Sequence, residues 1–435
     1  MANFTESSSK LLNDTNGNQV NFDVPSTTGI YTMSVQDIFG ATTGLGNLQV
    51  GSGTFSSLEG FVYGSAGTDV ITANYNAGAT NPGASLYGKG GNDTLVGNSR
   101  NNTFVGGAGS DIYDLNGGNN TLIWNVDVGG SSSDSSTGAL DYVYDFNAAN
   151  DALVVVASNV SNLNASSAVS LVSLTPNNPR IIADPLNGGN GTFTQIKVEL
   201  GATDLVVEFQ GSRSASDISN ALRVDITGTD GANNLIGSIF ADTFDGAGGD
   251  DILDGGRGAD QLTGGAGQDT FVFAAGDSIA SVTSQTSDGQ TTNVVDVTYD
   301  TISLIGLADL GDDKDALDLV GTPTIASTND IGTTSDSGVI KSHLVTDGLI
   351  TFDDQDTYAE ALGGSSFQLW EAIKYLQANF SKAESAVVFQ HQTDSYLFQD
   401  NGAAGNDLFV QLSNVSVEGL TTSDATSTAN YLYIV

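Results

Sequence analysis

GTDGANNLI-GSIFADTFD-GAGGDDILD-GGRGADQLT-GGAGQDTFV, residues 228 to 272, divides into five repeats of nine residues without a gap. Every repeat begins with Gly and has Asp or Asn at its sixth position. The eighth position is always apolar: Leu235, Phe244, Leu253, Leu262 and Phe271. Gly permits the positive φ of a tight turn, and the last three residues of each repeat suit a very short strand. This period predicts a solenoid of stacked coils.

A second block of four repeats covers residues 88 to 123, and an outlying repeat, GSAGTDVIT, covers residues 64 to 72. The sixth positions of these repeats are Asp69, Asp93, Asn102, Asp111 and Asn120. Three positions depart from the pattern. Arg100 and Phe240 stand where the fourth Gly is expected, and Leu115 replaces a first Gly. We expect those turns to be poor cation sites.

Two repeats should complete one turn of a flattened coil, so that every second repeat lies in the same sheet. Leu235, Leu253 and Phe271 should then stack in one sheet, and Phe244 and Leu262 in the other. The sixth residues of repeats n and n+2 come side by side, where two carboxylates repel unless a cation lies between them. Ca²⁺ takes six to eight oxygens at roughly 2.3–2.6 Å, which two Asp and several turn carbonyls supply.

The repeat Gly-Gly-x-Gly-x-Asp-x-aliphatic-x resembles the RTX (repeats-in-toxin) nonapeptide, the hemolysin-type calcium-binding repeat. The nine repeats in register cover about a fifth of the chain. The resemblance implies parallel β-rolls that hold several Ca²⁺ ions. It assigns metal binding to Asp69, Asp93, Asp111, Asn233, Asp242, Gly246, Gly248, Asp251, Gly255, Asp260, Gly264 and Asp269.

Carried over repeat by repeat, the resemblance ranks the expected ion sites. The better pairs are Asp242 with Asp260, Asp251 with Asp269, and Asp93 with Asp111. Asn233 with Asp251 should be weaker, and Asn102 with Asn120 poor, because an amide carries no charge.

The predicted fold is all-β, with two parallel β-rolls, β-rich caps, flanking β domains and one short helix near the C-terminus. Residues 140–156 and 299–320 follow the two blocks and are interpreted as caps, because the last coil of a solenoid exposes its core and its strand edge. The helix is expected within residues 366–380, where Trp370 and Ile373 share one face with Leu376.

Six regions are predicted. A β-rich N-terminal region, with a possible role in anchoring or assembly, is followed by the first roll, a cap with a linking domain, the second roll, a second cap and a C-terminal domain with a secretion signal. Their bounds are 1–63, 64–125, 126–227, 228–275, 276–345 and 346–435.

The composition excludes several classes of protein. The chain has 435 residues, 12 basic and 51 acidic, for a net charge of −39, and only eight of the acids are Glu. Nucleic acids and anionic membranes require a basic face, which this chain cannot form. There is no cysteine for disulfides or thiolate ligands, and no apolar run long enough to span a bilayer.

Both ends of the sequence favour export. The N-terminal stretch lacks the charged and apolar regions of a Sec signal. The final residues, NYLYIV, follow an acidic and Ser/Thr-rich stretch and resemble the uncleaved C-terminal signal of type I secretion substrates. We therefore expect transit through type I secretion machinery to the extracellular medium or the cell surface.

No catalytic motif is found, so we expect a protein that is not an enzyme. His343 and His391 are too far apart for a His-Glu-x-x-His zinc site, and each is interpreted as a surface or strand histidine. A Gly-x-Ser-x-Gly elbow is absent. The leading hypothesis is self-assembly into a surface layer (S-layer) or an extracellular fibre. The alternative is a non-catalytic adhesin or polysaccharide-binding protein with cell-surface polysaccharide as partner, and an enzyme of unknown type is a third, weaker hypothesis.

Overall fold

The structure, a computed structural model, is almost entirely β-structure and confirms the predicted all-β fold with parallel β-rolls. It describes short strands between residues 10 and 63, and then residues 67–73, 83–128, 134, 139–171, 180–200, 204–287, 290–303, 315–319, 321, 324–326, 339–355, 361–380, 385–402, 407–417, 420–421 and 432–434. Two compact units form, one of residues 1–159 with 165–225 and one of residues 160–164 with 226–435. The finer six-part division stays a prediction.

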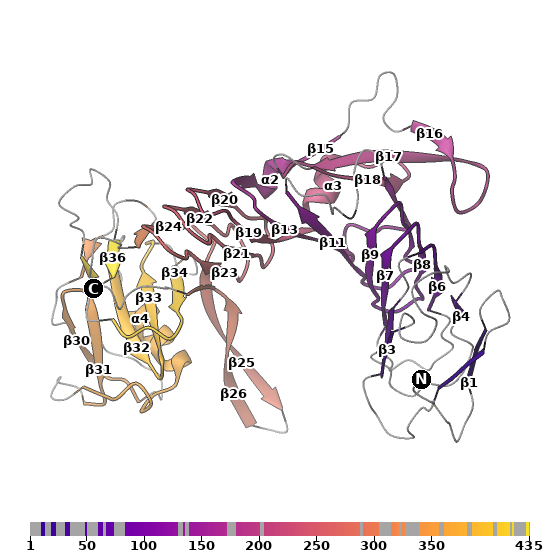
Figure 1. The fold of residues 1–435 in the computed structure, drawn as a ribbon. Helices are drawn as coiled ribbons and strands as arrows, with labels where there is room; N and C mark the ends of the chain where they lie inside the picture. Colours follow the sequence, from indigo (N-terminus) through magenta and orange to yellow (C-terminus); the bar gives the residue numbers. More distant parts are fainter. Residues whose placement is uncertain are drawn as a thin grey trace. The chain divides into compact units, whose positions relative to one another are not determined.

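In the second unit, the five repeats of residues 228–272 form five strands of three residues each (Figure 1). They are β20 (Asn234–Ile236), β21 (Thr243–Asp245), β22 (Ile252–Asp254), β23 (Gln261–Thr263) and β24 (Thr270–Val272). β20, β22 and β24 pair in parallel in one sheet, while β21 pairs with β23 in the other. The predicted stacks are confirmed, because Leu235 lies opposite Leu253 and Leu253 opposite Phe271.

Steric contact between successive turns explains the fourth-position glycines. Gly258 and Gly267 have φ of 147° and 132°, which L side chains rarely adopt. A Cβ on Gly267 would lie 2.2 Å from the carbonyl oxygen of Gly249, in the turn two repeats earlier. The turns therefore stack backbone against backbone at the spacing of neighbouring strands.

The first unit holds the first roll, which is built in the same way. One sheet contains β4 (Leu48–Gln49), β6 (Val70–Thr72), β8 (Thr94–Val96) and β10 (Ile112–Asp114). The other contains β3 (Tyr31–Ser34), β5 (Gly60–Tyr63), β7 (Ala84–Gly90), β9 (Thr103–Ala108) and β11 (Thr121–Asp127). A separate hairpin joins β1 (Lys10–Asn13) to β2 (Gln19–Phe22). The parallel pairing therefore extends into the N-terminal region, before the first recognisable repeat.

The two segments interpreted as caps, residues 140–156 and 299–320, begin with a further coil of each roll. In the first roll, β12 (Asp141–Tyr144) pairs in parallel with β10, and β13 (Ala152–Ser158) with β11. In the second roll, β27 (Asp300–Ser303) pairs with β23, and β28 (Ala316–Asp318) with β24. The inserted residues lengthen the turns before these strands without interrupting the sheets.

One sheet of the first roll continues beyond its extra coil, first through a parallel strand and then through antiparallel strands of the same unit. β18 (Leu205–Gln210) pairs with β12, and β17 (Asn190–Val198) pairs with β18. β15 (Val169–Leu171) and β16 (Arg180–Ala183) both pair with β17, and α2 (Ala165–Ala168) and α3 (Ala215–Ser219) are the described helices here. β19 (Leu222–Thr227) begins in the first unit and ends in the second, in the same sheet as β13 and β21.

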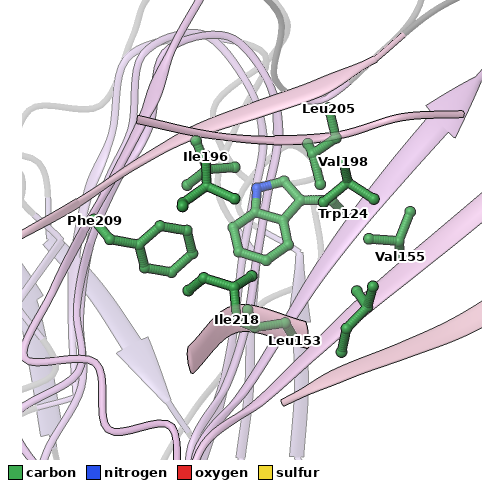
Figure 2. A pocket seen from close by; sticks show the side chains of 10 residues that line it. Trp124, Leu153, Val155, Ile196, Val198, Leu205, Phe209 and Ile218 are labelled. Atoms are coloured by element: carbon green, nitrogen blue, oxygen red, sulfur yellow. The ribbon is translucent and has the colours of Figure 1, made fainter. Parts of the chain in front are cut away.

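Figure 2 shows the indole of Trp124 among aliphatic side chains and Phe209 of β18. The space between them is lined by apolar side chains that are buried, so it belongs to the core.

The C-terminal part of the second unit is a sheet packed against one helix. The sheet contains β30 (Ser342–Thr346), β31 (Leu349–Asp353), β32 (Ser385–His391), β33 (Asp394–Gln399) and β34 (Leu408–Leu412). β27 pairs with β34, which joins this sheet to the second roll. The helix α4 (Leu369–Asn379) confirms the helix predicted within 366–380, and Ile373 and Leu376 are buried in the core.

The remaining described strands of the second unit flank these layers. β25 (Ile279–Ser287) and β26 (Gln290–Thr298) form an antiparallel hairpin that extends away from the roll (Figure 1). The others are β14 (Asn162–Asn164), β29 (Thr324–Ile325), β35 (Leu420–Thr421) and β36 (Leu432–Ile434).

The inward stack should dominate the stability of the second roll. We expect Leu253→Ala to lower the free energy of unfolding by about 2–5 kcal/mol, because Leu253 is fully buried and its loss leaves a cavity. The neighbouring Ile252 is 44% exposed, so Ile252→Ala should change the stability by about 0.5 kcal/mol or less. Urea unfolding at saturating Ca²⁺ measures both. Equal losses in the two variants would contradict the inward stack.

Candidate metal centres

The sixth residues of the second roll form two ladders of hydrogen bonds from backbone to side chain. In one ladder, Asn233 N donates to Asp251 Oδ1 at 2.7 Å, and Asp251 N donates to Asp269 Oδ1 at 3.0 Å. In the other, Asp242 N donates to Asp260 Oδ1 at 2.7 Å. Each bond spans 18 residues, which is two repeats. The structure thus brings together the residue pairs that the repeat spacing predicts.

The first roll carries the same ladders. Asp69 N donates to Asp93 Oδ1 at 2.8 Å, and Asp93 N donates to Asp111 Oδ1 at 2.7 Å. On the other sheet, Asn102 N donates to Asn120 Oδ1 at 2.9 Å. The outlying repeat of Asp69 therefore joins the ladder, although 24 residues separate it from Asp93.

Each ladder continues for one rung beyond the repeats, through four residues that sequence reasoning missed. Asp111 and Asn120 donate to Oδ1 of Asp141 and Asp151, and Asp260 and Asp269 donate to Oδ1 of Asp300 and Asp315. These bonds span 30, 31, 40 and 46 residues, so a fixed period of nine cannot find them. A signal does exist, because DYVY, DALV, DTIS and DALD all repeat the Asp-x-apolar-x end of the nonapeptide.

The second carboxylate oxygen of most ladder aspartates is buried and has no hydrogen-bond partner. This holds for Oδ2 of Asp93, Asp111, Asp251, Asp260, Asp269 and Asp300. A buried charged oxygen without a partner is costly, so each of these carboxylates needs either a proton or a compensating cation.

In the repeats with Asp at the sixth position, the first glycine leaves the space beside this oxygen open. A Cβ on Gly246 would lie 2.2 Å from Asp251 Oδ2 and 2.4 Å from the carbonyl oxygen of Gly264. On Gly255 and Gly264 it would lie 2.3 and 2.1 Å from Oδ2 of the Asp in the same repeat. Gly248, another predicted ligand, lies in the same turn and pairs with Ala266. Carboxylate and carbonyl oxygens therefore meet where a side chain would otherwise be.

Burial makes these carboxylates hard to ionise without a cation. Burial, with the charges of Asp111 and Asp69, raises the pKa of Asp93 to about 8. Burial likewise raises the pKa of Asp111 to about 7 and that of Asp251 to about 6. Burial and the charge of Asp300 raise the pKa of Asp260. A bound divalent cation would hold all of them ionised.

The donor set fits a hard cation such as Ca²⁺. It consists of oxygen only, from Asp side chains and turn carbonyls. Among the described residues, no three His, Asp or Glu side chains gather closely enough to hold a metal by themselves. Backbone carbonyls of the turns would therefore have to complete the coordination.

Asn at the sixth position provides a hydrogen bond in place of a cation. Asn102 Nδ2 donates to the carbonyl oxygens of Arg100 and Asn98 at 2.7 and 3.0 Å. Asn233 Nδ2 donates to the carbonyl oxygen of Gly231 at 2.5 Å. The amide thus uses turn carbonyls that a metal would need. This is a physical reason to expect weak or absent binding at these positions, although the ligand assignment itself stays a prediction.

Comparison with known proteins identifies the repeats. The family described as RTX calcium-binding nonapeptide repeat (4 copies) matches residues 87–122, 227–262 and 248–280. No curated protein matches the chain. The chain therefore carries calcium-binding RTX repeats, and its ladders of buried Asp are consistent with calcium sites. No helix among the described residues is long and apolar enough to cross a bilayer.

Removing one ladder charge should weaken calcium binding. Asp251→Asn keeps the oxygen that accepts from Asn233 N but removes the charge, so we expect a calcium affinity at least about tenfold lower, or about 1.4 kcal/mol. Asp230→Asn, at an exposed position of the same roll, is the matched control and should leave the affinity unchanged. Isothermal titration calorimetry measures both. Equal affinities in the two variants would remove Asp251 from the metal site.

Calcium-free protein should become less stable as pH rises from about 4 to about 8. The raised pKa values mean that the native state binds protons more tightly than the unfolded chain does, so protonation favours folding. The gain is complete below the unfolded value of 3.8 and is lost above the native values. Thermal unfolding after chelation should give a higher Tm at pH 5 than at pH 8. The opposite order would show that these carboxylates are not the source of instability.

Proposed function

We propose that this chain is a secreted structural protein that folds on calcium and self-assembles on or near the bacterial cell surface, as a surface layer or an extracellular fibre. The observation that carries the proposal is the set of buried Asp oxygens without hydrogen-bond partners in both rolls. A protein with such a core depends on an external cation for its native state.

The proposed mechanism couples folding to export. Where free Ca²⁺ is scarce, a chain of net charge −39 repels itself and its rolls stay open, which suits passage through a secretion channel. Outside the cell, Ca²⁺ binds the folded form only. Extracellular modules bind with Kd of about 10⁻⁴–10⁻³ M, and an ion at about 100 times its Kd adds about 2.7 kcal/mol per site. Several sites together would rival the stability of a whole domain, about 5–15 kcal/mol.

Two surface features support self-assembly. The large negative charge keeps free subunits apart until a divalent cation screens or bridges them. In the first unit, β16 is paired through β17, and its residue Ile181 is 72% exposed. An exposed strand with an apolar side chain is a natural place for a strand of another copy to add.

The two histidines support a role without catalysis. His343 lies buried in β30, with Nδ1 2.8 Å from the hydroxyl of Tyr375. His391 lies in β32, with Nε2 3.1 Å from the carbonyl oxygen of Phe367. Both side chains are therefore engaged in the C-terminal core. A non-catalytic adhesin or polysaccharide-binding protein remains the alternative within the same proposal.

Electron microscopy tests assembly directly. Purified protein should form ordered sheets or fibres at millimolar Ca²⁺, and these should disappear on chelation and return when Ca²⁺ is restored. Mg²⁺ at equal concentration is the control, since it prefers a rigid octahedral shell of waters and should not replace Ca²⁺. Monomers that persist in Ca²⁺ and bind a glycan array would favour the adhesin instead.

A further inference from the structure

The last rungs of the two rolls differ in how their terminal carboxylates are satisfied. In the first roll, Asp141 Oδ1 accepts from Asp111 N, and Asp141 Oδ2 accepts from Trp124 Nε1 at 2.7 Å. The hydroxyl of Tyr113 lies 3.3 Å from the same Oδ2. Protein donors therefore already hold both oxygens of this carboxylate.

Asp151, at the end of the second ladder of the first roll, also has hydrogen-bond donors for both of its carboxylate oxygens. Asp151 Oδ1 accepts from Asn120 N at 2.8 Å, and Asp151 Oδ2 accepts from Asn147 N at 2.7 Å. A cation is not needed to compensate a carboxylate whose two oxygens both accept hydrogen bonds.

In the second roll, Asp300 is the first residue of the ladder after the repeats, as Asp141 is in the first roll, but one of its carboxylate oxygens has no hydrogen-bond donor. Asp300 Oδ1 accepts from Asp260 N at 3.0 Å, but Asp300 Oδ2 has no hydrogen-bond partner. Oδ2 of Asp260 is also buried without a partner, and both residues are only 1% exposed. Two buried carboxylates that meet in this way require either a shared proton or a cation.

From this contrast we infer that Asp300, which lies outside every nonapeptide repeat, forms an additional calcium site with Asp260, and that the equivalent rung at Asp141 is closed by Trp124 and binds no metal. The inference rests on the proposed calcium-dependent folding. The turn of Gly255 borders the Asp260 carboxylate and would add carbonyl oxygens. Asp254 and Asp277 add further negative charge near Asp300.

A cation at this rung would connect the second roll to the C-terminal sheet. Asp300 N donates to Ser278 Oγ at 2.7 Å, and Ser278 Oγ donates to the carbonyl oxygen of Phe409 in β34 at 2.5 Å. Asp300 also lies opposite Val410 in the parallel pairing of β27 with β34. Fixing the Asp300 carboxylate therefore fixes the start of the strand on which the C-terminal sheet docks.

Counting bound ions in matched variants tests the inference. Asp300→Asn keeps the acceptor for Asp260 N but removes the charge, and Asp141→Asn makes the same change at the closed rung. Native mass spectrometry of full-length protein at saturating Ca²⁺ should show one ion fewer in Asp300→Asn and the wild-type number in Asp141→Asn. Equal numbers in wild type and Asp300→Asn would overturn the inference, as would the loss of an ion in Asp141→Asn.

The calcium content of the wild type distinguishes a failure of the proposed function from a failure of this inference, and crystallography covers the case in which the variant does not fold. Wild-type protein without any bound calcium would defeat the proposed function itself, whereas calcium-loaded wild type with an unaffected Asp300→Asn variant would defeat only this inference. If Asp300→Asn does not fold, an anomalous difference map from wild-type crystals grown with Ca²⁺ decides. A peak between Asp260 and Asp300, with none between Asp111 and Asp141, supports the assignment, and its absence at Asp260 refutes it.

Docking of the C-terminal sheet provides a second readout. Calcium should slow amide hydrogen exchange in β34 of the wild type, and this protection should be lost in Asp300→Asn but kept in Asp141→Asn. Protection of β34 that is unchanged in Asp300→Asn would contradict the proposed connection between the rung and the sheet.

Discussion

The structure depends on one asymmetric interaction, in which most ladder carboxylates accept a backbone N–H at Oδ1 and keep Oδ2 buried without a hydrogen-bond donor. The first half of this interaction sets the spacing of successive coils, because it joins sixth residues that lie 18 positions apart. The unpartnered Oδ2 atoms place negative charge in the core, and no hydrogen bond within the roll stabilises that charge. The backbone hydrogen bonds of the rolls are therefore formed, but the negative charge of the buried carboxylates is not compensated by the protein.

Asparagine and aspartate at the same position solve this problem in opposite ways. The amide of Asn102 supplies donors to the turn carbonyls, so its turn is satisfied by the protein alone. Asp251 presents an oxygen where Asn102 presents a nitrogen, so its turn gains acceptors and lacks donors. The choice of Asn or Asp along a ladder thus decides which turns are stabilised by hydrogen bonds of the protein alone and which need a cation.

The repeat period predicted the stacks of Leu253 and Phe271 and the pairing of Asp251 with Asp269, because both follow from nine residues per half-coil. It did not predict Asp141 and Asp300, because insertions in the preceding turns break the count while leaving the short strand motif intact. Alternation of apolar residues also could not show that β18 pairs with β12 and β34 with β27, since such a pattern does not specify a partner strand. Whether Asp300 Oδ2 has a hydrogen-bond partner depends on the donors that the fold brings near it, and the sequence does not specify those donors.

The insertion between Asp260 and Asp300 has a consequence for how such a protein can change over time. The coil is re-entered after 40 residues instead of 18, and loop closure costs only about 0.6 kcal/mol for each doubling in length. Because the added residues fold back as the hairpin of β25 and β26, they occupy space outside the roll and leave its register intact. Such a turn is a site where a solenoid can accept inserted segments of different length and function without a change in the packing of its core.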